Sequence, residues 1–165
     1  MTSNSKLSVA IATYNEAQNI IRCLESIKDI ADEIIIVDGS STDNTVNLAK
    51  NYHVQITTTT NKPIFHINKQ MAIDLSNNQW ILQLDADEVV TKALANEIQN
   101  IINMDEDSIR KRFINPSKEK LFKRHLQVLI DRGDKFHQED SETVAFFIPR
   151  LNMFLGKPLK HGGVY

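Results

Sequence analysis

The amino-acid sequence predicts an α/β protein built on an open, mostly parallel sheet with helices on its faces. Through residues 1–103, short apolar runs alternate with segments of helical periodicity, and short polar connections join them. The apolar runs are continuous, which is typical of strands covered on both faces, as in a parallel sheet. Ligands of such sheets bind outside the carboxyl ends of the strands, so a functional site is expected there.

Four apolar runs predict the strands of this sheet. They span residues 7–13, 33–37, 54–60 and 80–84. The first two are rich in β-branched residues, and the threonines of the third predict a position nearer an edge of the sheet. The fourth run ends abruptly in Asp85 and Asp87, which are separated by one alanine.

Segments with apolar residues at helical spacing follow these strands. They predict helices over residues 16–30, 43–52, 64–76 and 91–103. Asn15 is the predicted N-cap of the first helix, and Thr42 or Asp43 that of the second. The fourth helix is predicted to open at Thr91.

The region that follows is dense in charges of both signs. A proline at position 116, apolar residues at helical spacing and Gly133 predict an amphipathic helix. The run 144–148 predicts a further strand, and residues 149–165 are expected to be irregular. The charges indicate either a patch for a partner or membrane surface, or a solvated helical insertion, and the mixed signs favour the insertion.

Length and composition exclude several classes of protein. A chain of 165 residues with 41% hydrophobic and 24% charged residues is that of an ordinary soluble domain with a substantial core. The net charge of −2 gives no basic field, so nucleic acid is not an expected partner. The single cysteine, Cys23, excludes an intrachain disulfide and fits a reducing compartment. No stretch has the pattern of a signal peptide or the length of a membrane span, so the expected location is the cytoplasm.

Polar residues follow three of the predicted strands, and they should converge at one edge of the sheet. They are the sets 13–16 (TYNE), 38–41 (DGSS) and 85–87 (DAD). Two neighbouring carboxylates repel each other, whereas a divalent cation and the diphosphate of a substrate would hold them together. The alternative for Asp85 and Asp87 is that one of them caps the helix that follows.

The loop after Asp38 also has two interpretations. Its small polar residues are typical of helix capping, whereas in a nucleotide site Asp38 would accept a hydrogen bond from a base and the loop amides would face phosphate. The position of Asp38 beside the two aspartates favours the second interpretation. Lys69 would balance a diphosphate, or it is simply an exposed lysine.

Three motifs resemble those of family 2 glycosyltransferases of the GT-A fold. They are SVAIATYNE at residues 8–16, IIIVDGSSTDNT at 34–45 and LDADE at 84–88, in the order and at the separations of that family. The segments 149–156 (PRLNMFLG) and 161–165 (HGGVY) are similar to a bacterial branch that includes lipopolysaccharide-core glucosyltransferases. The resemblance implies that Thr13, Asn15 and Glu16 line the nucleoside pocket and that Asp38 contacts the uracil of a UDP-sugar.

The resemblance also implies a metal site. Asp85 would face the ribose, and Asp87 together with Asp85 would bind Mg²⁺ or Mn²⁺ against the donor diphosphate. Lys69 stands where the family has a basic residue near the nucleotide. The metal would stabilise the departing nucleoside diphosphate as a Lewis acid.

The implied reaction is the transfer of a sugar, with inversion, from a nucleotide-diphospho-sugar to a saccharide or lipid-linked acceptor. The first candidate donor is a UDP-hexose. The implied pathway is bacterial envelope polysaccharide or lipopolysaccharide synthesis. Members of the family continue past the Gly-Gly-x-Tyr element, so we expect a truncated domain whose general base lies beyond Tyr165. Residues 104–143 would be a charged helical insertion, and residues 144–165 the start of the acceptor side.

Three expectations follow from an incomplete domain. The alternative function is a catalytically silent nucleotide-sugar-binding module that needs a partner chain. An incomplete sheet would expose apolar edges, so self-association is expected. The inner face of the cytoplasmic membrane is the alternative location.

Overall fold

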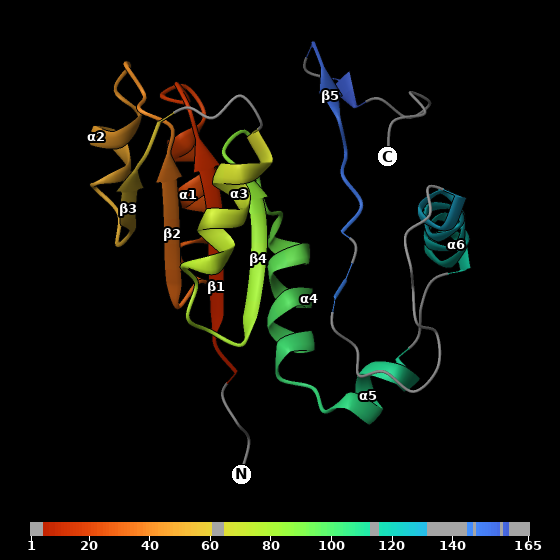
Figure 1. Cartoon of the computed structure of the whole chain (residues 1–165). Helices are drawn as coiled ribbons and strands as arrows, with labels where there is room; N and C mark the ends of the chain where they lie inside the picture. The colour runs from red at the N-terminus through yellow and green to blue at the C-terminus, as the bar shows by residue number, and fades with distance from the viewer. Residues whose placement is uncertain are drawn as a thin grey trace. The chain divides into compact units, whose positions relative to one another are not determined.

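The computed structural model of the chain describes residues 5–60, 65–112, 116–131, 145–146, 148–155 and 157–158. These residues belong to two compact units, Met1–Met104 and Asp105–Tyr165. The first unit contains the predicted parallel sheet, and Figure 1 shows its strands running side by side.

The sheet has four strands in the order β3-β2-β1-β4, and every neighbouring pair is parallel. The strands are β1 (Leu7–Thr13), β2 (Glu33–Asp38), β3 (Gln55–Thr58) and β4 (Trp80–Asp85). Every residue of β1 is buried, as its continuous apolar sequence predicts for a central strand. The threonine-rich β3 lies at an edge of the sheet, which confirms the predicted position.

Helices cover both faces of the sheet. On one face, α1 (Ile20–Ile27), α2 (Thr45–Ala49) and α4 (Lys92–Ile102) enclose the larger core, which contains side chains of all four strands. On the other face lies α3 (Phe65–Asp74), as Figure 1 shows. Its Ala72 packs against Ala10, Ile35 and Val37. Burying each large aliphatic side chain of these cores contributes roughly 1.5–3 kcal/mol relative to leaving it exposed.

The first helix begins later than the sequence predicts. Its N-cap is Asn19, so the prediction of Asn15 as N-cap is wrong. Asn15 has a left-handed backbone with φ 57°, which a helix start does not tolerate, and the carbonyl of Glu16 accepts from the amides of Asn19 and Ile20. The segment 16–19 is therefore a turn, and the helix that follows covers only Ile20–Ile27.

The predicted N-cap is also wrong for α2, whereas it is correct for α4. The N-cap of α2 is Asn44, not Thr42 or Asp43, although the Asp43 carboxylate still accepts from the amide of Thr45 at 3.0 Å. The prediction for α4 is confirmed, because the Thr91 hydroxyl caps it by accepting from the amide of Leu94 at 3.2 Å.

The second unit contains α5 (Glu106–Lys111), α6 (Pro116–Asp131) and a short antiparallel pair, β5 (Met153–Phe154) and β6 (Lys157–Pro158). The amphipathic helix begins at Pro116 as predicted, whereas Gly133 lies outside the described residues. The predicted strand 144–148 is wrong where it can be compared, because residues 145, 146 and 148 have no strand structure. There the Arg112 guanidinium lies 4.9 Å from the ring centre of Phe146.

None of the helices in the described parts of the chain is both long enough and apolar enough to cross a membrane.

Candidate functional site

The carboxyl ends of three neighbouring strands lie side by side, as the sequence predicts. Thr13 at the end of β1 pairs with Asp38 at the end of β2, and Ala12 pairs with Asp85 at the end of β4. The polar sets that follow these strands therefore share one rim of the sheet. We call this edge, with residues 12–16, 38–45 and 85–88, the carboxyl rim.

Asp38 is buried at the carboxyl rim, with an exposure of 1%. Its carboxylate accepts hydrogen bonds from the Thr13 hydroxyl at 2.9 Å, the Ser41 hydroxyl at 2.6 Å and the Ser41 amide at 2.8 Å. A buried carboxylate is tolerated only when donors satisfy it, and these three donors do so. In this structure Asp38 fixes the loop after β2, and its contact with a base stays a prediction.

Asn15 joins the first loop of the carboxyl rim to the second. Its side-chain oxygen accepts from the Thr42 amide at 2.8 Å, and its own amide donates to the Ser41 hydroxyl at 2.9 Å. Asparagine is one of the few residues that adopt a left-handed backbone at modest cost, which explains its place at φ 57°. Ser40, at φ 63°, is a second such position in the adjoining loop.

Glu16 is held at the carboxyl rim from both sides. Its amide donates to the Thr45 hydroxyl at 2.7 Å, and its carboxylate accepts from the Asn19 side chain at 2.8 Å. Asp43 and Thr45, which accept from the amides of Ala17 and Glu16, are not among the site residues predicted from the sequence. The Thr45 hydroxyl donates to the Asp43 carboxylate, and this bond, with further bonds from the amides of Ala17 and Thr45, lowers the pKa of Asp43.

The two aspartates lie on a tight turn that two hydrogen bonds between Asp85 and Glu88 close. The Glu88 carboxylate accepts from the Asp85 amide at 2.9 Å, and the Glu88 amide donates to the Asp85 carbonyl at 2.9 Å. Ala86 is buried within the turn, whereas Asp87 is exposed. Neither aspartate caps α4, since Thr91 does so, and this removes the capping explanation for the pair.

Lys69 reaches the same turn from α3. Its ammonium forms an ion pair with the Asp85 carboxylate, and the two side chains are 15% and 21% exposed. The side-chain amide of Gln83 donates to the same carboxylate oxygen at 3.1 Å. Lys69, predicted only from its position in the sequence, is thus brought to the carboxyl rim and is not a simple exposed lysine.

Between these residues the carboxyl rim has a hollow of about 230 Å³. It is lined by Ala12, Tyr14, Glu16, Asp85, Ala86 and Asp87. Within the described residues there is no group of three or more side chains that would hold a metal ion by themselves. Two carboxylates on one turn nevertheless fit a Mg²⁺ or Mn²⁺ ion that takes its other ligands from a diphosphate and water. The Lys69 ammonium on Asp85 shows that this carboxylate already accepts a cationic partner.

Cys23 lies directly beneath this turn. Its thiol donates to the Asp85 carbonyl at a sulfur–oxygen distance of 3.7 Å. Burial, followed by the nearby charges of Glu88 and Asp87, raises the pKa of Cys23 to about 12. The thiol is therefore neutral and acts as a packed side chain, not as a nucleophile.

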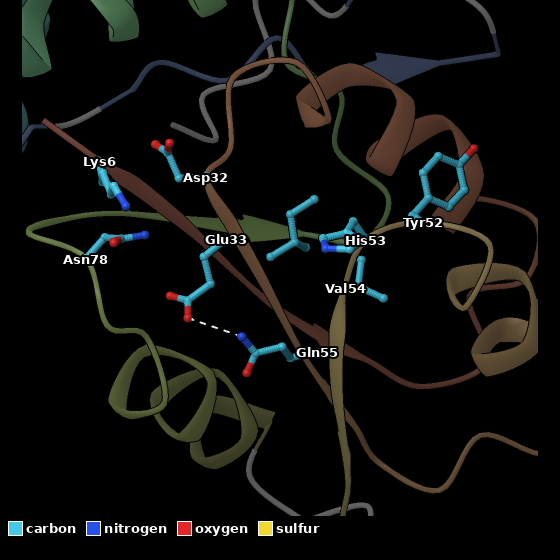
Figure 2. Close-up of a pocket in the computed structure, with 9 residues that line it drawn as sticks. Lys6, Asp32, Glu33, Tyr52, His53, Val54, Gln55 and Asn78 are labelled. Atoms are coloured by element: carbon cyan, nitrogen blue, oxygen red, sulfur yellow. Dashed lines mark hydrogen bonds between the residues drawn. The ribbon is translucent and has the colours of Figure 1, made fainter. Parts of the chain in front are cut away.

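A larger hollow of about 410 Å³ lies at the opposite end of the sheet, and Figure 2 shows the side chains around it. Its central acid, Glu33, accepts from the Ser8 hydroxyl at 2.5 Å, from Gln55 at 3.3 Å and from both the amide and the side chain of Asn77 at 2.9 and 2.7 Å. Because these donors occupy both carboxylate oxygens, Glu33 fastens the amino ends of the strands together. The predicted site residues all lie at the other end.

Sequence comparison connects the chain with bacterial glycosyltransferases. An uncharacterized glycosyltransferase of Rickettsia bellii is 42% identical over 98 residues, which cover 58% of this chain and 32% of that protein. One from Rickettsia prowazekii is 40% identical over the same lengths. SunS of Bacillus subtilis is 33% identical over 97 residues, which cover 58% of this chain and 23% of that glycosyltransferase. The matched part thus spans about a third or less of these relatives' length.

Comparison of structures gives the same fold. Staphylococcus aureus TarS 1–349 in complex with UDP matches with a TM-score of 0.52 at 24% identity, over 59% of this chain and 32% of that one. The mannosyltransferase PcManGT of Pyrobaculum calidifontis, in complex with GDP-Man and Mn²⁺, matches with a TM-score of 0.51 at 23% identity, over 59% and 32%. Such likeness establishes the GT-A fold, as the motifs predict. Residues 8–163 also match the profile of glycosyl transferase family 2, and the chain therefore belongs to that family.

Proposed function

We propose that this chain carries the donor-binding half of a metal-dependent, inverting glycosyltransferase that uses a UDP-hexose. The observation that carries the proposal is the carboxyl rim, where polar residues follow three neighbouring strands and where Asp85 and Asp87 line a hollow together with Tyr14 and Glu16. The family assignment and relatives that are named glycosyltransferases support it.

In this proposal the loops of the carboxyl rim bind the nucleoside. The left-handed backbone of Asn15 and the buried carboxylate of Asp38 hold the two loops together, so Thr13, Asn15 and Glu16 are placed before any ligand arrives. Sites that are ordered in advance lose less conformational entropy on binding. TarS has been crystallised with UDP, which supports a uridine nucleotide as the first candidate donor.

The two aspartates would hold a divalent metal ion against the diphosphate. When bound, the ion would supply Lewis-acid stabilisation to the departing nucleoside diphosphate. Lys69 would add a second positive charge on the side of α3. The acceptor hydroxyl would attack the anomeric carbon from the face opposite the departing diphosphate, which inverts the configuration. The complex of PcManGT with GDP-Man and Mn²⁺ supports Mn²⁺ as the ion to test first.

The finer parts of the proposal concern the pathway. The resemblance of residues 149–156 to lipopolysaccharide-core enzymes supports an acceptor that is a growing saccharide or glycolipid of the bacterial envelope. The corresponding location is the cytoplasm or the inner face of the cytoplasmic membrane. The general base of the complete enzyme is not assigned to a residue of this chain.

Calorimetric titration with UDP and GDP, each with and without Mn²⁺, tests the proposal. UDP should bind only weakly without the ion and more tightly with it, and Asp87→Ala should remove that gain. Asp29→Ala, which removes an exposed carboxylate just after the C-cap of α1, is the matched control and should bind like the original chain. Mn²⁺-dependent UDP binding that survives in Asp87→Ala would refute the metal site.

A second function is a nucleotide-sugar-binding module without activity of its own. In this alternative a partner chain would complete the site. Release of UDP from a UDP-hexose, with or without a saccharide acceptor, separates the two functions. Turnover by the 165-residue chain would exclude the silent module.

A further inference from the structure

Asp85 already has a cation beside it. The Lys69 ammonium contacts one oxygen of the Asp85 carboxylate, and Gln83 donates to the same oxygen. Both side chains of the ion pair are mostly buried, so water and salt screen their attraction much less than that of an exposed pair. Leaving Asp85 without a positive partner would be costly in such a place.

The position of Lys69 is fixed by the packing of its helix. Ala72, one turn further along α3, is fully buried against Ala10, Ile35 and Val37 of the sheet. Because α3 is anchored there, the ammonium stays within reach of the carboxyl rim even when it leaves Asp85. The lysine side chain has the length and the rotational freedom to move its charge between neighbouring anions.

A divalent ion that approaches Asp85 therefore meets a competitor. Two cations at one carboxylate repel each other, and at a mostly buried site water and salt screen this repulsion only weakly. A diphosphate removes the conflict, because its oxygens offer the ammonium another anion nearby.

We propose that Lys69 is the resident counter-cation of Asp85, which keeps the metal ion from binding stably until a nucleoside diphosphate arrives and takes over the ammonium. The inference rests on the proposed donor site. Metal and nucleotide then bind cooperatively, and by linkage each raises the affinity for the other by the same factor.

The test measures three affinities by calorimetry: Mn²⁺ alone, UDP in the presence of EDTA, and UDP at saturating Mn²⁺. Lys69→Met should bind Mn²⁺ alone about tenfold more tightly than the original chain, because the competing charge is gone. It should bind UDP in EDTA about tenfold more weakly, because the charge no longer meets the diphosphate. By linkage, the factor by which Mn²⁺ raises UDP affinity equals the factor by which UDP raises Mn²⁺ affinity. This factor should fall in Lys69→Met, because Mn²⁺ already binds more tightly without UDP. A purely structural role would weaken all three affinities together.

Two further variants complete the design. Lys69→Arg keeps the charge and should retain weak Mn²⁺ binding, and Lys50→Met, at the exposed C-cap of α2, should change none of the three affinities. Lys69→Gln, which keeps a hydrogen-bond donor for Asp85, replaces Lys69→Met if the latter does not fold by circular dichroism.

The outcomes separate this inference from the proposed function. Mn²⁺ binding that is equal or weaker in the folded, uncharged variant would overturn the role of Lys69. A chain that binds neither UDP nor GDP in the presence of Mn²⁺ would instead overturn the donor site, and the titration with Mn²⁺ alone would still decide whether Lys69 competes for Asp85.

Discussion

At the scale of single residues, the carboxyl rim depends on acids that the protein itself satisfies. Asp38 is the clearest case, because its three donors come from the end of β1 and from its own loop. Its carboxylate is therefore needed to hold the loop that brings Ser41 and Thr42 to Asn15. A change at Asp38 should lower stability even before any ligand is considered.

Asp38→Asn should reduce the free energy of unfolding by about 1–3 kcal/mol, because an amide group would face donors that need an acceptor. Urea unfolding measures the loss. Asp29→Asn, at an exposed position, should change stability little. If Asp38→Asn were as stable as the original chain, the hydrogen bonds to Asp38 would not hold the loop.

Glu33 provides a residue-scale prediction of pH dependence at the amino ends of the strands. Burial opposes its ionisation, but hydrogen bonds from Ser8, Asn77 and Gln55 outweigh burial and lower the pKa of Glu33 below its ordinary 4.5. A carboxyl whose pKa is lower in the folded state stabilises the fold above its unfolded pKa, and this contribution is lost as the pH falls through the folded pKa.

Glu33→Gln should therefore lower stability at pH 7 by about 1–2 kcal/mol, and the difference from the original chain should shrink as the pH falls below the ordinary pKa of 4.5 and through the lower pKa of the folded state. Urea unfolding from pH 7 down to pH 3 measures it, with the exposed Glu97→Gln of α4 as control. A difference that does not change with pH would mean that the charge of Glu33 is not what stabilises the fold.

At the scale of elements, the cap of α4 connects local structure to the site. Thr91 begins α4 three residues after Glu88, the residue that closes the aspartate turn. The cap satisfies one of the amides that a helix start leaves without a partner. Fraying at Thr91 would loosen the chain directly after that turn.

Thr91→Ala should cost about 1 kcal/mol of stability, whereas Thr91→Ser, which keeps the hydroxyl, should cost much less. Thermal unfolding followed by circular dichroism measures both variants. Mn²⁺-dependent UDP affinity should fall in Thr91→Ala more than in Thr91→Ser. Equal stability of the two variants would show that the Thr91 hydroxyl does not cap α4.

The strands and helices differ in how well the local sequence predicts them. The strands of the parallel sheet were found because continuous apolar runs report burial on both faces. The start of α1 was misplaced because helical spacing alone does not reveal a left-handed residue such as Asn15. The strand predicted over 144–148 shows the limit of apolar composition, because composition does not say whether a neighbouring strand is present to pair with it.

At the scale of the whole molecule, the convergence of the carboxyl rim followed from topology, since parallel strands place their carboxyl ends together. The long-range partners within the rim did not follow, because they join residues far apart in the sequence. The pair Lys69–Asp85 and the bond from Thr13 to Asp38 depend on how α3 and the loops pack. Such pairing satisfies Asp38 and Asp85, whereas Asp87 is exposed to solvent.

The division of the chain into two units gives a prediction about the whole molecule. The two clusters of buried apolar side chains lie between Leu7 and Ile102, and the carboxyl rim ends at Glu88. The first unit, Met1–Met104, thus contains its own core together with every predicted donor residue. A unit with its own core can fold independently.

A chain ending at Met104 should therefore unfold cooperatively in urea and bind UDP with Mn²⁺ as tightly as the 165-residue chain. The matched control is the same shortened chain with Asp87→Ala, which should fold equally well and lose the effect of Mn²⁺. A folded fragment without UDP affinity would place part of the donor site after residue 104, because the carboxyl rim would then be insufficient by itself. A fragment without a cooperative transition would show instead that the second unit stabilises the first, and that the sheet needs more than its own two apolar layers.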